Sequence, residues 1–264
     1  NDLIDNINKV VDIFDEPFAD SSCLPTELIS RFASKDLKVV LSGDGGDEIF
    51  LGYNRYLFAK KVKSFQSFTP RVMRSLIQDF LNFFPSNFYD LIGTPFQKIL
   101  GIQGFSHKIM KLSNILDYNN NNDFYKKLNI IDNDELENFS KDDQQFFQNY
   151  YEMGLIQSIQ HNDVEYYLPN DILTKVDRAS MKNSLEVRSP FLDHVLVDTV
   201  SNFSVEAKIN GNTLKYLLKK ILSKYVPPRL FSRPKMGFAI PIDNWLKQKK
   251  MMNLCDDVFN NVDW

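Results

Sequence analysis

The sequence has little cysteine and no excess of positive charge. Only Cys23 and Cys255 occur, without C-x-x-C spacing, so we expect neither a disulfide framework nor a cysteine zinc site. The 31 basic and 34 acidic residues give a formal net charge of −3. Such a balance provides no general positive field for nucleic acid or an anionic membrane. These absences favour a small molecule as partner, and no nucleic acid.

Long apolar runs are missing as well. No run approaches the roughly 20 residues that a membrane-spanning helix requires, and no basic segment precedes an apolar one at the start. We therefore expect a cytoplasmic protein with no membrane partner. What the sequence does contain, 264 residues of which 43% are hydrophobic and 25% charged, is typical of a globular chain with a substantial core.

The spacing of apolar residues predicts helices around a short strand. Apolar residues between Leu3 and Phe14 recur at helical spacing, and residues 26–34 indicate a second helix with Thr26 as its N-cap. The stretch LKVVLSG, residues 37–43, is a short apolar run without alternation, which predicts a strand covered on both faces. A helix, strand, loop, helix order is typical of a parallel α/β sheet.

The rest of the chain is expected to be mainly helical. Residues 57–160 show helix-like apolar spacing, with a loop or surface segment at Tyr118–Asp123 on composition. Apolar residues between Leu214 and Tyr225 predict a further helix, which Pro227 and Pro228 stop.

The loop SGDGGDE, residues 42–48, concentrates three glycines and three acids after the predicted strand. Glycines at the carboxyl end of a parallel strand let backbone amides approach a ligand. However, Asp44, Asp47 and Glu48 would repel a bare phosphate, and the loop lacks the lysine of a P-loop. Mg2+ held by carboxylates and substrate phosphates would reconcile glycines with acids. The alternative is an ordinary turn whose acids favour the start of a helix.

Two further groups of charged residues are candidates for a site. Arg229, Arg233 and Lys235 either supply a cation that neutralises developing phosphate charge or form a solvated basic loop. The second group consists of Asp171, Lys175, Asp177, Arg178, Glu186, Arg188 and Asp193. Ion pairs one helical turn apart explain much of this second group.

Four segments between about residues 15 and 246 belong together as one pattern. They are DEPFADSS…P, VVLSGDGGDEIFLGYNRY, LPNDILTKVDRASMKNSLEVRSPFLD and RPKMGFAIPIDNWL. In these segments the chain closely resembles the synthetase domain of glutamine-dependent asparagine synthetases. The resemblance implies a predominantly helical α/β chain. Its parallel sheet would be a truncated one of the adenine-nucleotide alpha-hydrolase-like (ATP pyrophosphatase) type, with a large helical subdomain. We expect an α/β nucleotide-binding part at 1–56, a mostly helical subdomain at 57–160 and a helical part that closes the active site at 161–264.

The resemblance also implies a reaction and its cofactors, ATP and Mg2+. Family members adenylate the side-chain carboxylate of aspartate, release pyrophosphate, and let ammonia from a glutaminase domain displace AMP. Leu41, Ser42 and Gly43 resemble the residues that hold the nucleotide. Asp47 matches an acid that binds Mg2+ and pyrophosphate, and Asp44, where many members have Glu, is retained as an active-site acid.

The remaining roles fall on later segments. Lys235, in RPKMGF, resembles the lysine that stabilises pyrophosphate and the negative charge of adenylation. Asp171, Lys175 and Arg178 lie in the stretch that closes over the acyl substrate, aspartate or a related carboxylate.

Two parts of the family pattern do not occur in the sequence, the glutaminase domain and the SGG-DS pyrophosphate loop. Asn1 stands where the chain would continue after that loop and one or two further strand-helix units. We therefore expect a carboxy-terminal portion that is inactive alone, with an open sheet edge that a homodimer could cover. Two alternatives stay open. One is a relative that amidates another carboxylate, such as a β-lactam synthetase or an enzyme acting on a surface-sugar acid, and the other is a noncatalytic remnant.

Overall fold

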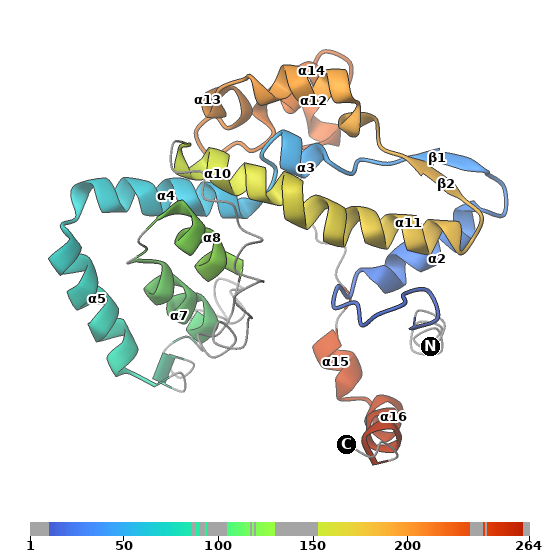
Figure 1. Cartoon of the computed structure of the whole chain (residues 1–264), viewed down its shortest axis with the longest axis horizontal. Helices are drawn as coiled ribbons and strands as arrows, with labels where there is room; N and C mark the ends of the chain where they lie inside the picture. Colours follow the sequence, from blue (N-terminus) through green and yellow to red (C-terminus); the bar gives the residue numbers. More distant parts are fainter. Residues whose placement is uncertain are drawn as a thin grey trace. The chain divides into compact units, whose positions relative to one another are not determined.

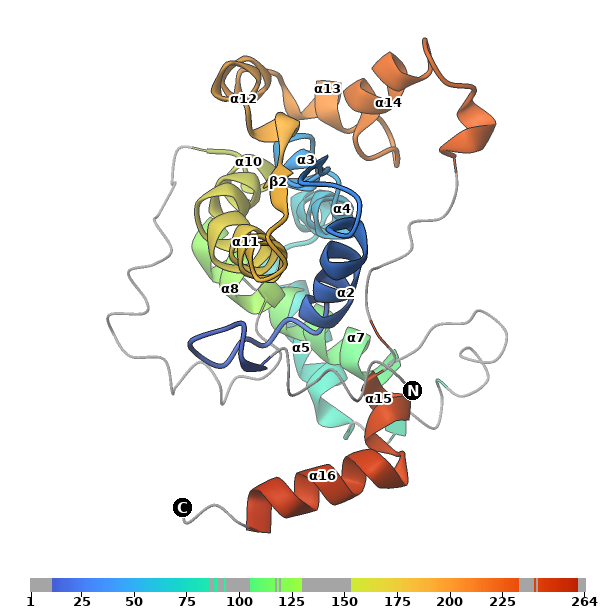
Figure 2. The same ribbon diagram turned by 90° about the vertical axis from the view of Figure 1, so that its right-hand side faces the viewer.

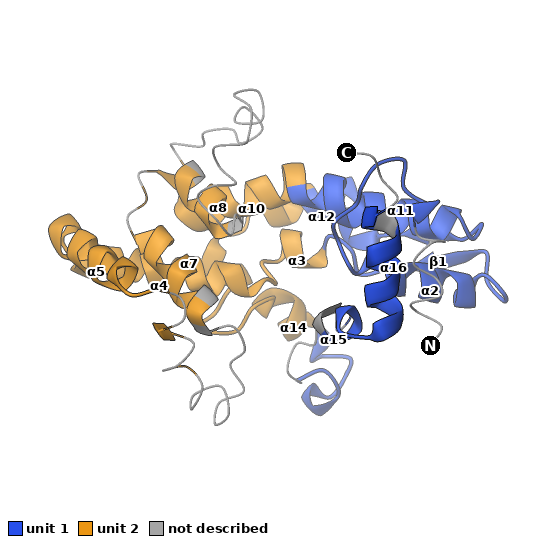
Figure 3. Cartoon of the chain, turned by 90° about the horizontal axis from the view of Figure 1, so that it is seen from below, with its two compact units in different colours: residues 1–45, 167–197, 222–264 blue, residues 46–166, 198–221 orange. Residues whose placement is uncertain are grey.

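The computed structural model describes two compact units (Figure 3). Unit 1 comprises residues 1–45, 167–197 and 222–264, and unit 2 comprises residues 46–166 and 198–221. The described residues are 11–85, 88–89, 93, 105–116, 118, 120–129, 153–232, 240 and 242–260. None of the helices in this part of the chain is long and apolar enough to span a bilayer. The expected division into three parts stays a prediction.

Unit 1 holds a two-stranded parallel sheet, β1 (Val39–Leu41) and β2 (Glu186–Arg188). Val40 lies opposite Val187 in the register. On this sheet, α11 (Thr174–Met181) packs against both β2 and α2 (Cys23–Ala33), so the two helices lie side by side (Figures 1 and 2). The prediction of a parallel sheet in a mostly helical chain is confirmed.

The prediction that the strand is covered on both faces is wrong. Val39 is 41% exposed and Leu41 is 72% exposed. Within the described residues, β1 has one neighbouring strand, β2. A run of branched apolar residues reports a preference for extended backbone, whereas burial also requires a layer of structure on each face.

The N-cap expected at Thr26 is also wrong. Helix α2 begins at Cys23, with Ser22 at the N-cap position, and the Thr26 hydroxyl donates to the Ser22 carbonyl at 2.7 Å. Pro25 lies inside the first turn, where a backbone N–H has no partner within the helix, so proline is tolerated there. Most of the helix expected between Leu3 and Phe14 lies outside the described residues.

Unit 2 is helical in its described part, as predicted for residues 57–160. Its helices α4, α5, α7, α8, α10 and α13 span Asn54–Phe68, Arg71–Phe83, Phe105–Leu116, Asn121–Asn129, Leu155–Asn162 and Val205–Lys208. Buried side chains such as Tyr56, Ile115, Phe124 and Ile159 join α4, α7, α8 and α10 into one hydrophobic core.

Two further element boundaries differ from the prediction. Helix α8 begins at Asn121, inside the segment expected to be a loop, and the Asn120 side chain accepts from the Asp123 amide at 2.9 Å. Asparagine is a preferred N-cap, so the asparagine run starts this helix. Helix α14 spans Tyr216–Leu222 and is shorter than expected.

Short or connecting elements complete the described chain. They are α3 (Gly46–Ile49), the π-helix η3 (Asp163–Leu173), η4 (Pro190–Leu192), α12 (His194–Ser201), η5 (Pro228–Leu230), α15 (Ile242–Leu246) and α16 (Lys249–Asn260). The helices α10, η3 and α11 follow one another directly along the chain. This continuous stretch carries several of the charged residues discussed below.

Candidate functional site

The predicted nucleotide loop leaves β1 at Ser42. The Ser42 amide donates to the Arg188 carbonyl at 2.8 Å, and its hydroxyl lies 2.9 Å from that of Ser189. These bonds tie the ends of β1 and β2 together. Beside Gly43 the described structure leaves open space, as a close approach of a ligand to the backbone requires.

Gly45 ends the part of the loop that belongs to unit 1. Its φ is +83°, and a Cβ atom at this position would clash with the side chain of Leu192. Both its conformation and its surroundings therefore require glycine. The boundary between the units falls after Gly45, so Asp44 belongs to unit 1 and Asp47 to unit 2.

A cavity of about 520 Å³ lies in unit 1, between α2, α11 and the two strands. Its volume is in the range of small-molecule sites, roughly 300–1,000 Å³. Among its lining residues are Leu41, Ser42 and Asp44, from the end of β1 and the loop, and Lys175 of α11. The cavity thus brings two of the predicted nucleotide-binding residues together with one predicted substrate-side residue. Gly43 and Arg178 are not among its lining residues.

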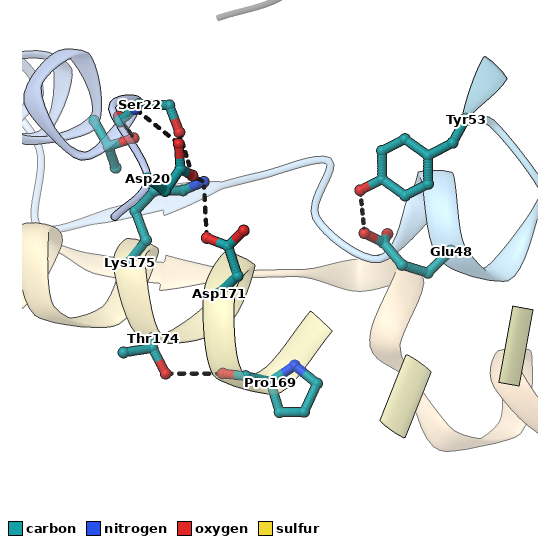
Figure 4. A network of polar contacts seen from close by, with 9 residues as sticks. Asp20, Ser22, Glu48, Tyr53, Pro169, Asp171, Thr174 and Lys175 are labelled. Atoms are coloured by element: carbon teal, nitrogen blue, oxygen red, sulfur yellow. Dashed lines mark hydrogen bonds and ion pairs between the residues drawn. The ribbon is translucent and has the colours of Figure 1, made fainter. Parts of the chain in front are cut away.

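Lys175 is the centre of a charged cluster (Figure 4). The residue as a whole is 7% exposed. Its ammonium group forms a close ion pair with Asp20 and lies 3.8 Å from the Asp171 carboxylate. The Asp20 carboxylate also accepts from the Ser22 amide at 2.8 Å and from the Ser22 hydroxyl at 2.6 Å. Asp171 and Lys175 are one turn apart, so the predicted ion pair is confirmed, but Asp20 takes the closer position.

The two carboxylates of this cluster differ in acidity. Burial opposes ionisation of Asp20, but hydrogen bonds from Lys175 and Ser22 outweigh it and hold its pKa below the ordinary value. Burial, followed by the neighbouring Asp20 charge, raises the pKa of Asp171 to about 6. Lys175 therefore stabilises the ionised form of Asp20 more than that of Asp171. Of the two carboxylates, Asp171 is the one that exchanges a proton nearer neutral pH.

Arg178 faces a different partner. Its guanidinium donates to the Asp15 carboxylate at 2.7 Å, and Asp15 is largely exposed. Of the three substrate-side candidates, Lys175 lines the cavity, Asp171 contacts Lys175, and Arg178 forms a pair near the surface.

Asp47 lies in the first turn of α3, in unit 2. Its side chain pairs with Lys215 at 3.2 Å, and its carbonyl accepts from the Gly52 amide at 2.7 Å. A Cβ atom at Gly52 would clash with the Asp47 carboxylate and with Lys215. Asp47 and Glu48 thus lie at the start of a helix, as the alternative reading of the loop expected. The Asp47 carboxylate is still partly exposed, which fits a ligand to Mg2+.

A magnesium site of protein ligands alone is not formed by the described residues, which contain no group of three or more His, Cys, Asp or Glu arranged for a metal. Mg2+ bound with a nucleotide typically takes one or two carboxylates and completes its shell with phosphates and water. Asp47 fits such a role, because its carboxylate is accessible and already attracts a cation, Lys215.

A second buried charge cluster, in unit 2, was not predicted from the sequence. Asp163 is fully buried; its carboxylate pairs with Arg55 at 2.9 Å and accepts from Tyr56 at 2.5 Å and Tyr125 at 2.8 Å. Burial raises the pKa of Asp163 to about 6, although these three neighbours favour its ionised form. Tyr56 and Asp163 are 107 positions apart, so no local spacing marks the cluster.

The sequence did contain a signal for Asp20, which belongs to the segment DEPFADSS. Spacing within that segment does not indicate a role for Asp20, because its lysine is 155 residues away. Lys235 and Arg233 lie outside the described residues, and Arg229 lies in η5. The roles of the predicted site residues therefore stay proposals.

Comparison with known proteins decides the family. The family model described as asparagine synthase matches residues 1–262. The chain belongs to the asparagine synthase family. The glutamine-hydrolysing asparagine synthetase 1 of Bacillus subtilis is 31% identical over 255 residues, which cover 94% of this chain and 38% of that protein.

Further members of the asparagine synthase family are similar over different lengths. A putative asparagine synthetase of Mycobacterium bovis is 29% identical over 259 residues, 96% of this chain and 37% of its own length. Putative asparagine synthetase 2 of Methanocaldococcus jannaschii is 52% identical over 56 residues, 21% of this chain and 11% of its own length. The chain thus spans well under half of these relatives. No solved structure matches it.

Proposed function

We propose that this chain is part of an ATP-dependent ligase that amidates the side-chain carboxylate of aspartate. The observation that carries the proposal is the cavity of unit 1, where Leu41, Ser42, Asp44 and Lys175 meet in a member of the asparagine synthase family. The relatives are named glutamine-hydrolysing asparagine synthetases, so ammonia derived from glutamine is the proposed nitrogen donor. In this proposal β1 and β2 belong to a sheet of the ATP pyrophosphatase type.

The first step of the proposed reaction joins aspartate to the nucleotide. Leu41, Ser42 and Gly43 hold ATP, and a side-chain oxygen of aspartate attacks the α-phosphorus while the bond to pyrophosphate breaks. Lys235 stabilises the charge that develops on the departing pyrophosphate. Mg2+, bound by Asp47 and the phosphates, would neutralise further phosphate charge.

The second step forms the amide. The nitrogen of ammonia attacks the acyl carbon of the adenylated aspartate, the carbon–oxygen bond to AMP breaks, and the nitrogen loses a proton. Asp44, on the wall of the cavity, is the acid that we place nearest to this chemistry. Lys175 is the substrate-side cation that the geometry supports best, because it lines the same cavity as Ser42.

Pyrophosphate release tests this proposal, with ATP, Mg2+ and ammonia, on the complete polypeptide in which the chain occurs. We expect release that requires aspartate and yields asparagine, and that Lys235→Ala abolishes. Lys175→Met should lower the rate about tenfold or more. Lys182→Met, at the exposed C-cap position of the same helix and outside the cavity lining, is the matched control and should change the rate less than threefold.

Other outcomes would point elsewhere. Release with another carboxylate but not with aspartate would replace the substrate and keep the reaction type. The absence of release with every carboxylate tested would favour a noncatalytic role. If Lys235→Ala kept a near-normal rate, Lys235 would be removed from the mechanism.

A further inference from the structure

The turn that carries Asp47 is held by a side chain from another helix. Helix α3 has only four residues, so nearly all of its carbonyls lack partners within the helix. The side-chain amide of Gln160, in α10, donates to the carbonyls of Glu48 and Ile49 at 2.8 and 2.9 Å. Both carbonyls directly follow Asp47 in the chain, and all these residues belong to unit 2.

Lys208 fixes the orientation of this amide. The Lys208 side chain is almost completely buried, and its ammonium group donates to Oε1 of Gln160 at 3.3 Å. Because an ammonium group can only donate, Oε1 must face Lys208 and Nε2 must face α3. The buried charge thus holds the two donors of Gln160 toward the two carbonyls.

A second connection joins α3 to the same helical stretch. Tyr53 donates to the Glu48 carboxylate, and the Arg55 guanidinium lies 4.3 Å from the centre of the Tyr53 ring. Arg55 in turn pairs with Asp163, three residues after Gln160. Both the backbone and the Glu48 side chain of α3 are therefore held, which restricts the rotation that would move Asp47.

We propose that Gln160, oriented by Lys208, is a positioning residue for Asp47. It does not touch the Asp47 carboxylate but fixes the backbone on which that carboxylate stands. The consequence for Mg2+ rests on the proposed function, whereas the hold on α3 does not. Partners behind a metal ligand commonly change metal affinity about 10–100-fold when they are replaced.

The test replaces Gln160 by methionine, which keeps its length and removes both donors. In the complete polypeptide, hydrogen exchange of amides in residues 46–52 should become at least tenfold faster. The Mg2+ concentration for half-maximal pyrophosphate release should rise about tenfold, and the KM for aspartate should stay within twofold. Binding of Mn2+ in the presence of ATP, measured by electron paramagnetic resonance, should weaken by a similar factor.

Gln157→Met is the matched control. Gln157 lies one turn earlier on the same helix, is exposed, and accepts from the Gly154 amide at 3.1 Å. The Gln157→Met variant should leave amide hydrogen exchange at residues 46–52 and Mn2+ binding unchanged. Gln160→Glu, which keeps an acceptor for Lys208 but removes the donors, should act in the same direction as Gln160→Met and serves if that variant does not fold.

The two ideas fail in distinguishable ways. Unchanged exchange at residues 46–52 in both Gln160 variants would overturn the positioning role, whatever the activity. Faster exchange with unchanged Mn2+ binding would overturn the link to Asp47 as a metal ligand. If the unmodified polypeptide released no pyrophosphate, the proposed function would fail, while the exchange measurement would still decide the hold on α3.

Discussion

The two units use buried charge differently. In unit 1, Lys175 lies between Asp20 and Asp171 on the wall of a cavity of about 520 Å³. In unit 2, Asp163 is enclosed by Arg55, Tyr56 and Tyr125 within a packed core. The first arrangement adjoins space for a ligand, whereas in the second the Asp163 carboxylate is held by an arginine and two tyrosine hydroxyls. Similar residue types therefore indicate a site in one unit and a structural network in the other.

The apolar residues show the same contrast. In the described part of unit 2, one cluster contains twelve buried residues, whereas the cluster of unit 1 contains two, Cys23 and Leu24. Both units also expose large apolar side chains, such as Leu41 in unit 1 and Phe68 in unit 2, so the contrast lies in the buried clusters. Because burial of apolar area is the main favourable contribution to folding, we attribute most of the stability of the described residues to unit 2.

The largest expected effect is the loss of a core aromatic ring from unit 2. Phe124 is fully buried and packs against Tyr118 with ring centroids 4.9 Å apart. Phe124→Ala should lower the free energy of unfolding by about 3–5 kcal/mol. Phe32→Ala, at a 71% exposed position of unit 1, should change it by about 0.5 kcal/mol or less. Urea unfolding followed by circular dichroism measures both, and similar losses would remove the contrast between the units.

A smaller effect is expected from the pH dependence of unit 2. Since the pKa of Asp163 is raised from 3.8 to about 6, the folded state binds an extra proton between these values. This contribution to stability is therefore present below about pH 4 and is lost as the pH rises to about 6. Asp163→Asn should remove it, which unfolding midpoints measured from pH 4 to pH 7 will show.

Tyr125→Phe sharpens this test. It removes one donor to the Asp163 carboxylate, so the pKa of Asp163 should rise further and the loss of stability should move to higher pH. A shift to lower pH, or identical pH profiles for the wild type and Asp163→Asn, would contradict the assignment.

The smallest effect is expected at the pair of Arg178 with Asp15 in unit 1. Asp15 is largely exposed, and such surface pairs contribute about 0–1 kcal/mol. Asp15→Asn should therefore change the unfolding free energy by less than about 1 kcal/mol. Asp20→Asn, which removes a partner of the buried Lys175, should have the larger effect in the same urea experiment. The reverse order would show that Lys175 depends little on Asp20.

Local sequence patterns predicted most of the helices and the strand, but they predicted side-chain exposure and helix starts less well. The strand, the helices between residues 57 and 160, and the glycine and acid loop follow from residue types at short spacing. The same patterns misjudged the exposure of Leu41 and the start of α2. Exposure depends on which other segments cover a strand, and a helix start depends on which residue first satisfies the free amides.

By itself, the sequence determined the family motifs, the parallel strand before the loop, and Leu41, Ser42 and Asp44 as candidates at the end of that strand. The tertiary structure decided that Lys175 would share their cavity, that Asp20 would pair with this lysine across 155 positions, and that Gln160 would hold the turn of Asp47. The physical reason is distance along the chain: spacing within a few residues encodes helices and turns, whereas contacts between remote residues arise only when packing brings their elements together.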